Sequence, residues 1–468
     1  MRLFSVFIII CSILLETNAK SESLGHVVLI TAPLFGHMIP LLDFAKRLSE
    51  YHHVTYIVSA SKLDILKQHV SINQTEANTS IQSRIEFIGL LDGNNDDYQV
   101  TNKGMNVPMR EIARRMHEPL LTLLFPEKTT TILATHSITR PIDLIITDLS
   151  VLTPVWESYT RNIPIYIFVP NSLLFFMHTI DIAIHNTKSG KVNPNFDHQI
   201  DFLVLLTKGI ICNSVFELDD IILDKLRRKS QPAANIPVLF VAPLISDDFA
   251  ETRQSSLIVH IKQWLDRHWE RANRSACVIY IAFGSWVSHD SKQLSEITNA
   301  LKPYPFIWSL KKKLQTLILP LGIDSEQHLL LDWTPQRFIL SHPAVRLFIS
   351  HGGWNSLLES MSAAKPTLVW PFFADQTVNG YRLEHEFGMG RHMLNTDLAS
   401  GQRIITSDEL TSYLKEIFAR EMEYLQNAQD IQDVIFHAKE NSSRLDVEKV
   451  IKIIDDQASK RMKKHHEL

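Results

Sequence analysis

Short apolar runs alternate along the chain with longer segments whose apolar residues recur at helical spacing. The runs are as long as strands and lack the polar alternation of a half-exposed strand, which is typical of parallel strands buried on both faces. Segment 39–50 has helical spacing, and the chain after Thr406 is predicted to be helical to its end. Strands are predicted at 26–31, 54–59, 142–147, 163–169, 209–212, 277–283, 306–310, 345–349, 367–370 and 391–394.

The predicted strands form two successive sets, each interrupted by helices. This order predicts an α/β fold of two doubly wound, Rossmann-like domains that face a cleft. Ligands of such sheets bind beyond the carboxyl ends of the strands, so the cleft has room for two substrates, one from each domain. We expect a leader at 1–19, an N-terminal domain at 20–245, a linker at 246–256, a C-terminal domain at 257–440, and a C-terminal helix and tail at 441–468.

The first residues have the pattern of a secretory signal peptide. Arg2 is followed by an apolar run at 3–15 and by a small-residue cleavage site, Thr-Asn-Ala, at 17–19. Since no other apolar run reaches the roughly 20 residues of a membrane-spanning helix, we expect no transmembrane anchor. Cys212 and Cys277 lie in strand-like runs and are predicted to be buried free thiols.

The segment 465–468 reads His-His-Glu-Leu and resembles the H-D-E-L signal that retains proteins in the endoplasmic reticulum. We therefore expect a protein of the secretory pathway that is kept in the lumen of the endoplasmic reticulum. The alternatives are a secreted protein and a solvated basic tail at 460–464. Sequons that can be glycosylated begin at Asn73, Asn78, Asn273 and Asn441.

The 468 residues carry a net charge of −4, and 45% of them are hydrophobic. This composition excludes a mostly disordered protein, and it lacks the basic excess of a nucleic-acid-binding protein. The 21 histidines raise the question of a metal site, but the pairs at 52–53 and 465–466 lack cysteine or carboxylate partners at ligand spacing. Because an Asp-x-Asp motif, a P-loop and a nicotinamide-binding glycine motif are also missing, we expect neither a metal nor a bound cofactor.

The stretch from Trp333 to Gln376 carries many recognisable positions at fixed spacing. It contains Trp-Thr-Pro-Gln at 333–336, His-Gly-Gly-Trp-Asn-Ser at 351–356 and Trp-Pro-Phe-Phe-Ala-Asp-Gln at 370–376. It resembles the signature box of the UDP-glycosyltransferases, which glycosylate small lipophilic molecules. The resemblance implies the GT-B architecture, with a UDP-sugar in the C-terminal domain and a small lipophilic acceptor in the N-terminal domain. Further motifs match the family in place and order at 36–40, 209–218, 278–285 and 306–308.

The box also has the chemistry of a diphosphate site. A glycine-rich turn between a strand and a helix presents free N–H groups and the positive end of the helix dipole. The resemblance assigns His351, Gly353, Asn355 and Ser356 to the phosphates, and it assigns Glu359 to the ribose hydroxyls. The other UDP-sugar-binding residues that it implies are Ser285, Trp333 stacked on uracil, Gln336 near the ribose, Trp354 beside the sugar, and Asp375 and Gln376 on the sugar hydroxyls.

His37 follows the first predicted strand, in a loop expected to enter a helix at Pro40. Imidazole suits a general base that acts on a hydroxyl near neutral pH, but it needs a partner that fixes its tautomer. Asp148 comes directly after the strand predicted at 142–147 and is the candidate partner, whereas Asp143 begins that strand and should lie at its opposite end. The resemblance implies the same catalytic pair.

These features together predict an inverting, metal-independent transferase that moves a sugar from a UDP-sugar to an acceptor hydroxyl. The plant-like end of the box at Gln376 favours glucose, and Gly352, where plant members usually have cysteine, is expected to be a harmless difference. Lumenal animal relatives often use glucuronic acid, but they typically carry a C-terminal membrane span that this sequence lacks. The alternatives are a glucuronosyltransferase, an inactive UDP-sugar-binding protein and a nucleotide-sugar epimerase. An apolar acceptor pocket is suggested by Leu173, Phe175, Phe176 and Met177.

Overall fold

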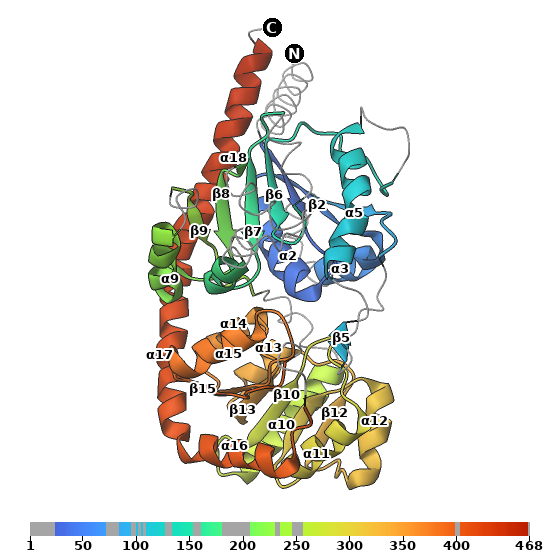
Figure 1. The fold of residues 1–468 in the computed structure, drawn as a ribbon, viewed down its shortest axis with the longest axis vertical. Helices are drawn as coiled ribbons and strands as arrows, with labels where there is room; N and C mark the ends of the chain where they lie inside the picture. Colours follow the sequence, from blue (N-terminus) through green and yellow to red (C-terminus); the bar gives the residue numbers. More distant parts are fainter. Residues whose placement is uncertain are drawn as a thin grey trace, which may run out of the picture.

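The structure, a computed structural model, has two sheets that lie one above the other along the long axis of the molecule (Figure 1). The predicted leader, Asn73, Asn78 and nearly all of the predicted linker lie outside the described residues. The described residues are 24–71, 84–94, 100–101, 104–105, 109–126, 133–152, 161–179, 206–229, 235–245, 256–397 and 403–466.

The N-terminal domain is built on a parallel sheet of seven strands. Across the sheet these are β3 (Ile85–Leu90), β2 (His53–Ser59), β1 (His26–Ile30), β6 (Leu144–Asp148), β7 (Ile165–Val169), β8 (Gly209–Cys212) and β9 (Val238–Phe240). The helices are α2 (Phe35–Ser49), η1 (Ala60–Lys62), α3 (Leu63–Ser71), α5 (Met109–Leu124) and α9 (Phe216–Lys229), and a separate hairpin pairs β4 (Val100–Thr101) with β5 (Gly104–Met105).

Both faces of this sheet are covered by helices, as its fully apolar strands predict. In β1, Val27 and Leu29 pack in one core with residues of α2, whereas Val28 and Ile30 pack in a second core with residues of α5. The short β9 and the partly polar β3 form the two edges of the sheet, and neither was predicted as a strand.

The C-terminal domain repeats this plan with a parallel sheet of six strands. Across the sheet these are β12 (His328–Leu331), β11 (Phe306–Ser309), β10 (Val278–Ala282), β13 (Val345–Ser350), β14 (Thr367–Val369) and β15 (Gly390–His392). The helices are α10 (Ser256–Arg271), α11 (Ser291–Leu301), α12 (Lys312–Ile318), η5 (Leu319–Leu321), α13 (Gln336–Ser341), α14 (Trp354–Ser362), α15 (Gln376–His385), α16 (Ser407–Ala419), α17 (Glu421–Glu440) and α18 (Ser442–His466). Two doubly wound α/β domains, as predicted, make up the molecule.

The last two helices run along one side of both domains (Figure 1). Helix α17 packs on α14 of the C-terminal domain, and α18 then returns to the N-terminal domain, where Val450 and Ile454 join the core beneath β1. Arg461 of α18 forms an ion pair with Asp143, 2.8 Å apart. None of the helices that the structure describes is long and apolar enough to cross a bilayer.

The two cysteines of the described chain are free, as predicted: Cys212 is buried and Cys277 is half-buried. Burial raises the pKa of both thiols, so both are protonated near neutral pH. The sequon asparagines Asn273 and Asn441 are both exposed.

Candidate functional site

His37 and Asp148 meet because their strands are neighbours. Strands β1 and β6 are parallel and paired, so their carboxyl ends lie at the same edge of the sheet. Asp148 ends β6, and His37 lies in the first turn of α2, which begins at Phe35 and not at Pro40 as the sequence predicted. Nδ1 of His37 is 2.8 Å from Oδ2 of Asp148.

The carboxylate of Asp148 is held in place by its own partners. It is fully buried, Oδ1 accepts from the backbone N–H of Ser150 at 2.7 Å, and Oδ2 lies 3.4 Å from the hydroxyl of Thr31. A carboxylate can only accept, so the proton of the imidazole lies on Nδ1 and Nε2 carries the lone pair that a base needs. Asp143 lies at the other end of β6, where it binds Arg461, as its position in the sequence predicts.

Two carboxylates act on the pKa of His37. Burial alone would lower it, but the charge and hydrogen bond of Asp148, together with the charge of Asp375, outweigh burial and raise the pKa above its ordinary value of 6.5. Asp375 belongs to the C-terminal domain, directly before α15. The histidine at the edge of one domain is therefore coupled electrostatically to a carboxylate of the other.

The turn from β13 to α14 has the form of an anion site. Gly353 precedes α14, whose first-turn N–H groups have no partner within the helix. A Cβ on Gly353 would lie 2.6 Å from Nε2 of His351, so the glycine lets the imidazole lie against the turn. Burial lowers the pKa of His351 to about 4, which keeps this side chain neutral at physiological pH. The exposed Ser285 follows β10, whose carboxyl end is next to that of β13.

A second group of predicted residues gathers at the start of α13. Nε2 of Gln336 donates to Oγ of Ser356 at 3.1 Å and to Oε2 of Glu359 at 2.5 Å. Burial raises the pKa of Glu359 to about 7, although the bond from Gln336 opposes this shift. Trp333 precedes the group and exposes 53% of its surface. Gln336 itself accepts from the hydroxyl of Tyr280 at 3.2 Å.

Asp375 is tied to the glycine turn through Asn379, and its neighbour Gln376 is held by the backbone before α15. Nδ2 of Asn379 donates to Oδ2 of Asp375 at 2.7 Å and to the carbonyl of Gly352 at 2.9 Å. Oε1 of Gln376 accepts from the backbone N–H groups of Phe372 and Phe373, so its amide N–H₂ is the end that can bind a hydroxyl. Burial raises the pKa of Asp375.

Trp354 and Asn355 both form hydrogen bonds to the N-terminal domain. The indole of Trp354 is 2% exposed and donates to the carbonyl of Asn213 at 2.6 Å, so its ring packs between the domains. Nδ2 of Asn355 donates to the carbonyl of Gly36 at 2.7 Å, which joins α14 to the first turn of α2.

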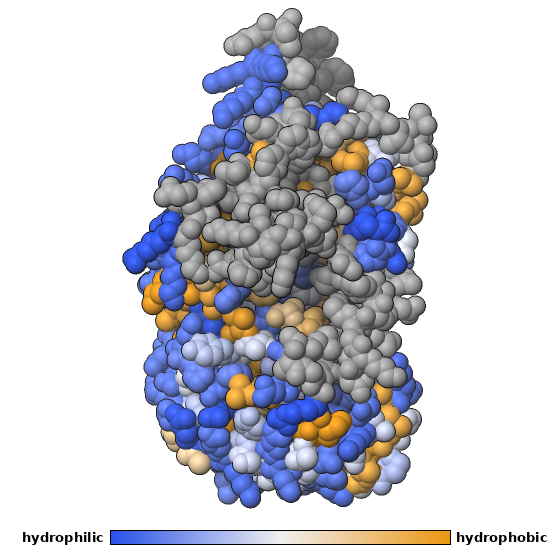
Figure 2. Space-filling view, viewed as in Figure 1, coloured by the Kyte–Doolittle hydropathy of each residue, from blue (hydrophilic) through white to orange (hydrophobic). Residues whose placement is uncertain are grey.

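The apolar residues expected to line an acceptor pocket are mostly core residues. Leu173, Phe176 and Met177 are buried in the cluster beneath β7 and β8, and only Phe175 is half-buried. Their neighbour Leu174 lines a groove of about 280 Å³ between α9 and α15, together with Ile222, Val378 and Tyr381. Figure 2 shows apolar surface at the junction of the domains on the side of α9 and α15, above a largely hydrophilic C-terminal domain.

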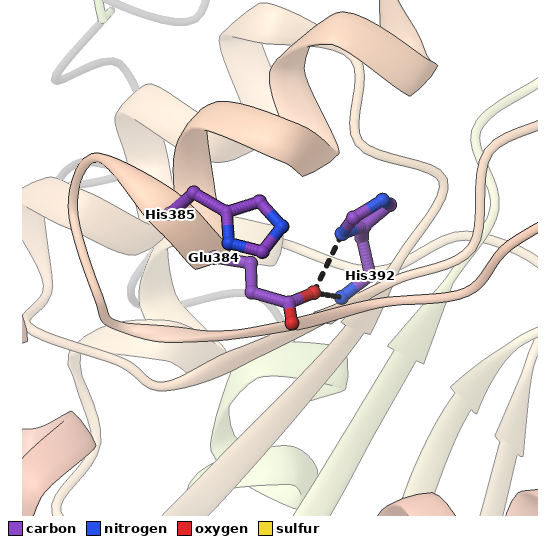
Figure 3. Close-up of side chains that lie close together, drawn as sticks. All are labelled: Glu384, His385 and His392. Carbon is purple, nitrogen blue, oxygen red and sulfur yellow. Dashed lines mark hydrogen bonds and ion pairs between the residues drawn. The ribbon is translucent and has the colours of Figure 1, made fainter.

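Glu384, His385 and His392 lie close enough to be considered as metal ligands (Figure 3). Oε2 of Glu384 already accepts from Nδ1 of His392 at 2.6 Å and from its backbone N–H at 3.0 Å. Oε1 of Glu384 forms an ion pair with Arg391, at 3.2 Å. The group is thus a hydrogen-bonded network beside a guanidinium, whose positive charge opposes the binding of a cation.

Sequence reasoning missed several residues that connect the site. Asn379 holds the glycine turn against Asp375, and Asn213 contacts both Trp354 and Asn355 from the N-terminal domain. Asn213 lies in the motif at 209–218 that the sequence analysis matched to the family without assigning it a role. Asn379 follows Asp375 by four residues, a spacing that predicts contact on a helix.

The chain is similar to known proteins over most of its length. Residues 260–440 match the family model "UDP-glucoronosyl and UDP-glucosyl transferase". A putative UDP-glucose flavonoid 3-O-glucosyltransferase of Fragaria ananassa is 25% identical over an alignment of 459 positions, which covers 85% of this chain and 91% of that one. UDP-glycosyltransferase 71D1 of Arabidopsis thaliana is 24% identical, over 91% of this chain and 97% of its own.

Among solved structures, UGT71G1 of Medicago truncatula in complex with UDP-glucose superposes with a TM-score of 0.71 at 21% identity, over 93% of this chain and all of that one. This likeness shows that the fold is GT-B. The turn between β13 and α14, the group around Gln336 and the pair after β14 all fall within the region that matches the family model. Residues 260–440 therefore form a UDP-glucoronosyl and UDP-glucosyl transferase domain, most of the chain is similar to plant UDP-glycosyltransferases, and the protein is a glycosyltransferase.

Proposed function

We propose that this enzyme transfers glucose from UDP-glucose to a hydroxyl group of a small lipophilic acceptor, with inversion at the anomeric carbon. The observation that carries the proposal is the buried hydrogen bond between His37 and Asp148, which provides a base coupled to Asp375 of the donor domain. A protein that only binds UDP-sugar would not need this pair.

The transfer is one in-line displacement. Nε2 of His37 takes the hydroxyl proton while the acceptor oxygen forms a bond to the anomeric carbon. The bond from that carbon to the diphosphate oxygen breaks, and its electron pair leaves with UDP. Asp148 stabilises the imidazolium that forms, as a carboxylate does for the histidine of a hydrolase triad. Attack opposite the leaving group converts an α-linked donor into a β-glycoside.

The departing diphosphate needs compensation of its negative charge. The free N–H groups at the start of α14 and the side chains of His351 and Ser356 support this role without a cation. Activity should therefore persist in excess chelator. Loss of activity in chelator and its recovery with Mn²⁺ would contradict this part of the proposal.

The choice of glucose rests on Asp375 and Gln376, which offer a carboxylate acceptor and amide donors to neutral sugar hydroxyls. The relative from Fragaria ananassa, by its name, uses UDP-glucose and a flavonoid, which supports both this sugar and a phenolic acceptor.

The test is a screen of UDP-glucose, UDP-galactose, UDP-glucuronic acid and UDP-xylose against phenolic, sterol and fatty-alcohol acceptors. Acceptor-dependent UDP release and the mass of the glycoside are measured, and His37→Ala serves as the inactive control. We expect the highest rate with UDP-glucose. A preference for UDP-glucuronic acid would identify a glucuronosyltransferase, and no release with any pair would favour a protein that binds UDP-sugar without transfer.

A further inference from the structure

The position of Pro40 leaves one carbonyl of α2 without its helical partner. In a helix the N–H of residue 40 donates to the carbonyl of residue 36, but proline has no N–H. The carbonyl of Gly36 accepts instead from Nδ2 of Asn355, at 2.7 Å, across the junction of the domains. Because Gly36 directly precedes His37, this bond joins the donor helix α14 to the main chain beside the proposed base.

Asn213 fixes the direction of the Asn355 amide. Nδ2 of Asn213 donates to Oδ1 of Asn355 at 3.0 Å, so the N–H₂ group of Asn355 must face Gly36. The amide of Asn213 is oriented in turn, since Oδ1 accepts from the N–H of Leu244 and Nδ2 donates to the carbonyl of Pro170, both at 3.3 Å. Asn213 is fully buried, so water does not substitute for these bonds.

We propose that Asn213, Asn355 and the Gly36 carbonyl freed by Pro40 form a hydrogen-bond relay across the domain junction, which positions His37 against the bound UDP-sugar. An amide N–H₂ has two donors, so Asn355 can hold Gly36 with one and a phosphate oxygen with the other. The relay rests on the proposed function. Asn213 and Pro40 are positioning residues, because they act on His37 through Asn355 and Gly36.

Other buried contacts hold α14 and α15 against the segment that contains Asn213. The carbonyl of Asn213 accepts from the indole of Trp354, the first residue of α14. A few residues later in the same segment, Asp219 forms an ion pair with Arg382 of α15, 2.8 Å apart, and both side chains are fully buried. One segment of the N-terminal domain therefore holds both helices that carry the donor-binding residues.

Two substitutions break the relay without touching the reacting atoms. Asn213→Asp replaces the donor to Asn355 by an oxygen, so the Asn355 amide must turn and present its own oxygen to the Gly36 carbonyl. Pro40→Ala restores the N–H that bonds Gly36 within α2, and alanine favours a helix, so this variant keeps the fold. The matched controls are Pro119→Ala, at a buried proline inside α5, and Asn427→Asp, whose amide donates to the Gly388 carbonyl at 2.7 Å within the C-terminal domain.

The first measurement separates chemistry from donor binding. We expect kcat to fall roughly 10–100-fold in Asn213→Asp and Pro40→Ala, the effect of misplacing a catalytic group. The Kd of UDP-glucose should stay within about threefold of wild type, a small change in binding free energy, and both controls should retain the wild-type kcat. If kcat is unchanged in both relay variants, or if the Kd rises as much as kcat falls, the proposal is wrong.

The second measurement does not depend on catalysis. The distance between the domains is measured with two spin labels in a Cys277→Ser background. The labels are attached at Glu118→Cys on α5 and Lys313→Cys on α12, which are exposed positions in different domains. We expect one narrow distance distribution in the parent and in Pro119→Ala, and a broader one in Asn213→Asp and Pro40→Ala. An unchanged distribution would overturn the relay. Should His37→Ala leave transfer intact, the proposed function fails, while the distances still decide whether the relay couples the domains.

Discussion

Nδ1 of His37 donates to Oδ2 of Asp148 across 2.8 Å, and this hydrogen bond joins residues that are 111 positions apart in the sequence. The imidazole is partly open, with 18% of its side chain exposed, while the carboxylate is fully buried. This asymmetry suits a base that must reach a substrate and a partner that must hold it. The bond also sets the pH range in which the base can act.

The first prediction concerns the acid limb of the pH profile. The pKa of His37 is raised above 6.5, so kcat/KM should fall as the pH drops through a value above 6.5, where the imidazole becomes protonated. In Asp148→Asn the effect of burial remains and only the charge of Asp375 opposes it, so the pKa of His37 is lower and the fall in kcat/KM should move to lower pH. The limiting rate should also fall, roughly 10²–10⁴-fold, because the tautomer is no longer held.

Rate measurements from pH 5 to 9 on wild type and Asp148→Asn test this prediction, with Asp143→Asn as the control carboxylate at the opposite end of β6. If kcat/KM of Asp148→Asn falls over the same pH range as that of the wild type, a group other than His37 controls this fall.

Glu359 makes the affinity for the donor depend on pH. Burial raises its pKa to about 7, and the carboxylate must be ionised to accept from both ribose hydroxyls, the role that the sequence resemblance assigns to it. UDP-glucose itself exchanges no proton between pH 6 and 8, so its Kd should be roughly tenfold higher at pH 6 than at pH 8. Glu359→Gln should bind more weakly and lose this dependence, as titration calorimetry can measure. Equal affinity of the wild type at both pH values would refute the assignment.

Gly352 has no room for a side chain in this backbone. Its φ is +82°, and a Cβ there would lie 2.4 Å from Cγ1 of Val369. Gly352→Cys should lower the free energy of unfolding by about 1–2 kcal/mol for the left-handed backbone, and by a further amount for the clash. In the Gly352→Cys background, Val369→Ala should relieve the clash and recover only that part of the lost free energy of unfolding. Thermal unfolding of the single and double variants separates the two effects, and a wild-type midpoint in Gly352→Cys contradicts them.

The ion pair between Asp219 and Arg382 should be the most costly interdomain contact to break. Both side chains are fully buried, and Asp219→Ala leaves the guanidinium of Arg382 paired only with the more exposed Glu386, 2.7 Å away, which costs up to about 3–5 kcal/mol. Asp219→Ala should therefore lower the midpoint of unfolding strongly, whereas Glu409→Ala, which breaks a partly exposed pair with Arg403, should change it much less. Similar midpoints for the two variants would argue against this assignment.

The sequence predicted the parts of the site that depend on strand order. His37 and Asp148 follow strand-like apolar runs, and parallel strands place their carboxyl ends at one edge, so their meeting needed only β1 and β6 to be neighbours. The glycine turn before α14 was recognisable for the same reason, because a strand, two glycines and a helix form a local motif.

The interdomain contacts could not be predicted, because they depend on how two folded domains pack. Asn213 and Asn355 are 142 positions apart, and neither has a local partner that marks it. Apolar residues next to a site are also ambiguous, as Leu173 and Phe176 show by packing in the core. Helix α18 returns to the N-terminal domain because its apolar residues Val450 and Ile454 pack in the core of that domain. The sequence predicted a helix here, but its pattern does not indicate which domain the helix packs on.

The most direct test of the central claim is the single-turnover rate of His37→Ala, measured beside its Kd for UDP-glucose. The account predicts that the transfer rate falls roughly 10²–10⁴-fold, because the base is lost. The Kd should remain that of wild type, because His37 belongs to the other domain and meets only the acceptor. A transfer rate within a few-fold of wild type, or a loss of donor affinity equal to the loss of rate, would contradict His37 as the base.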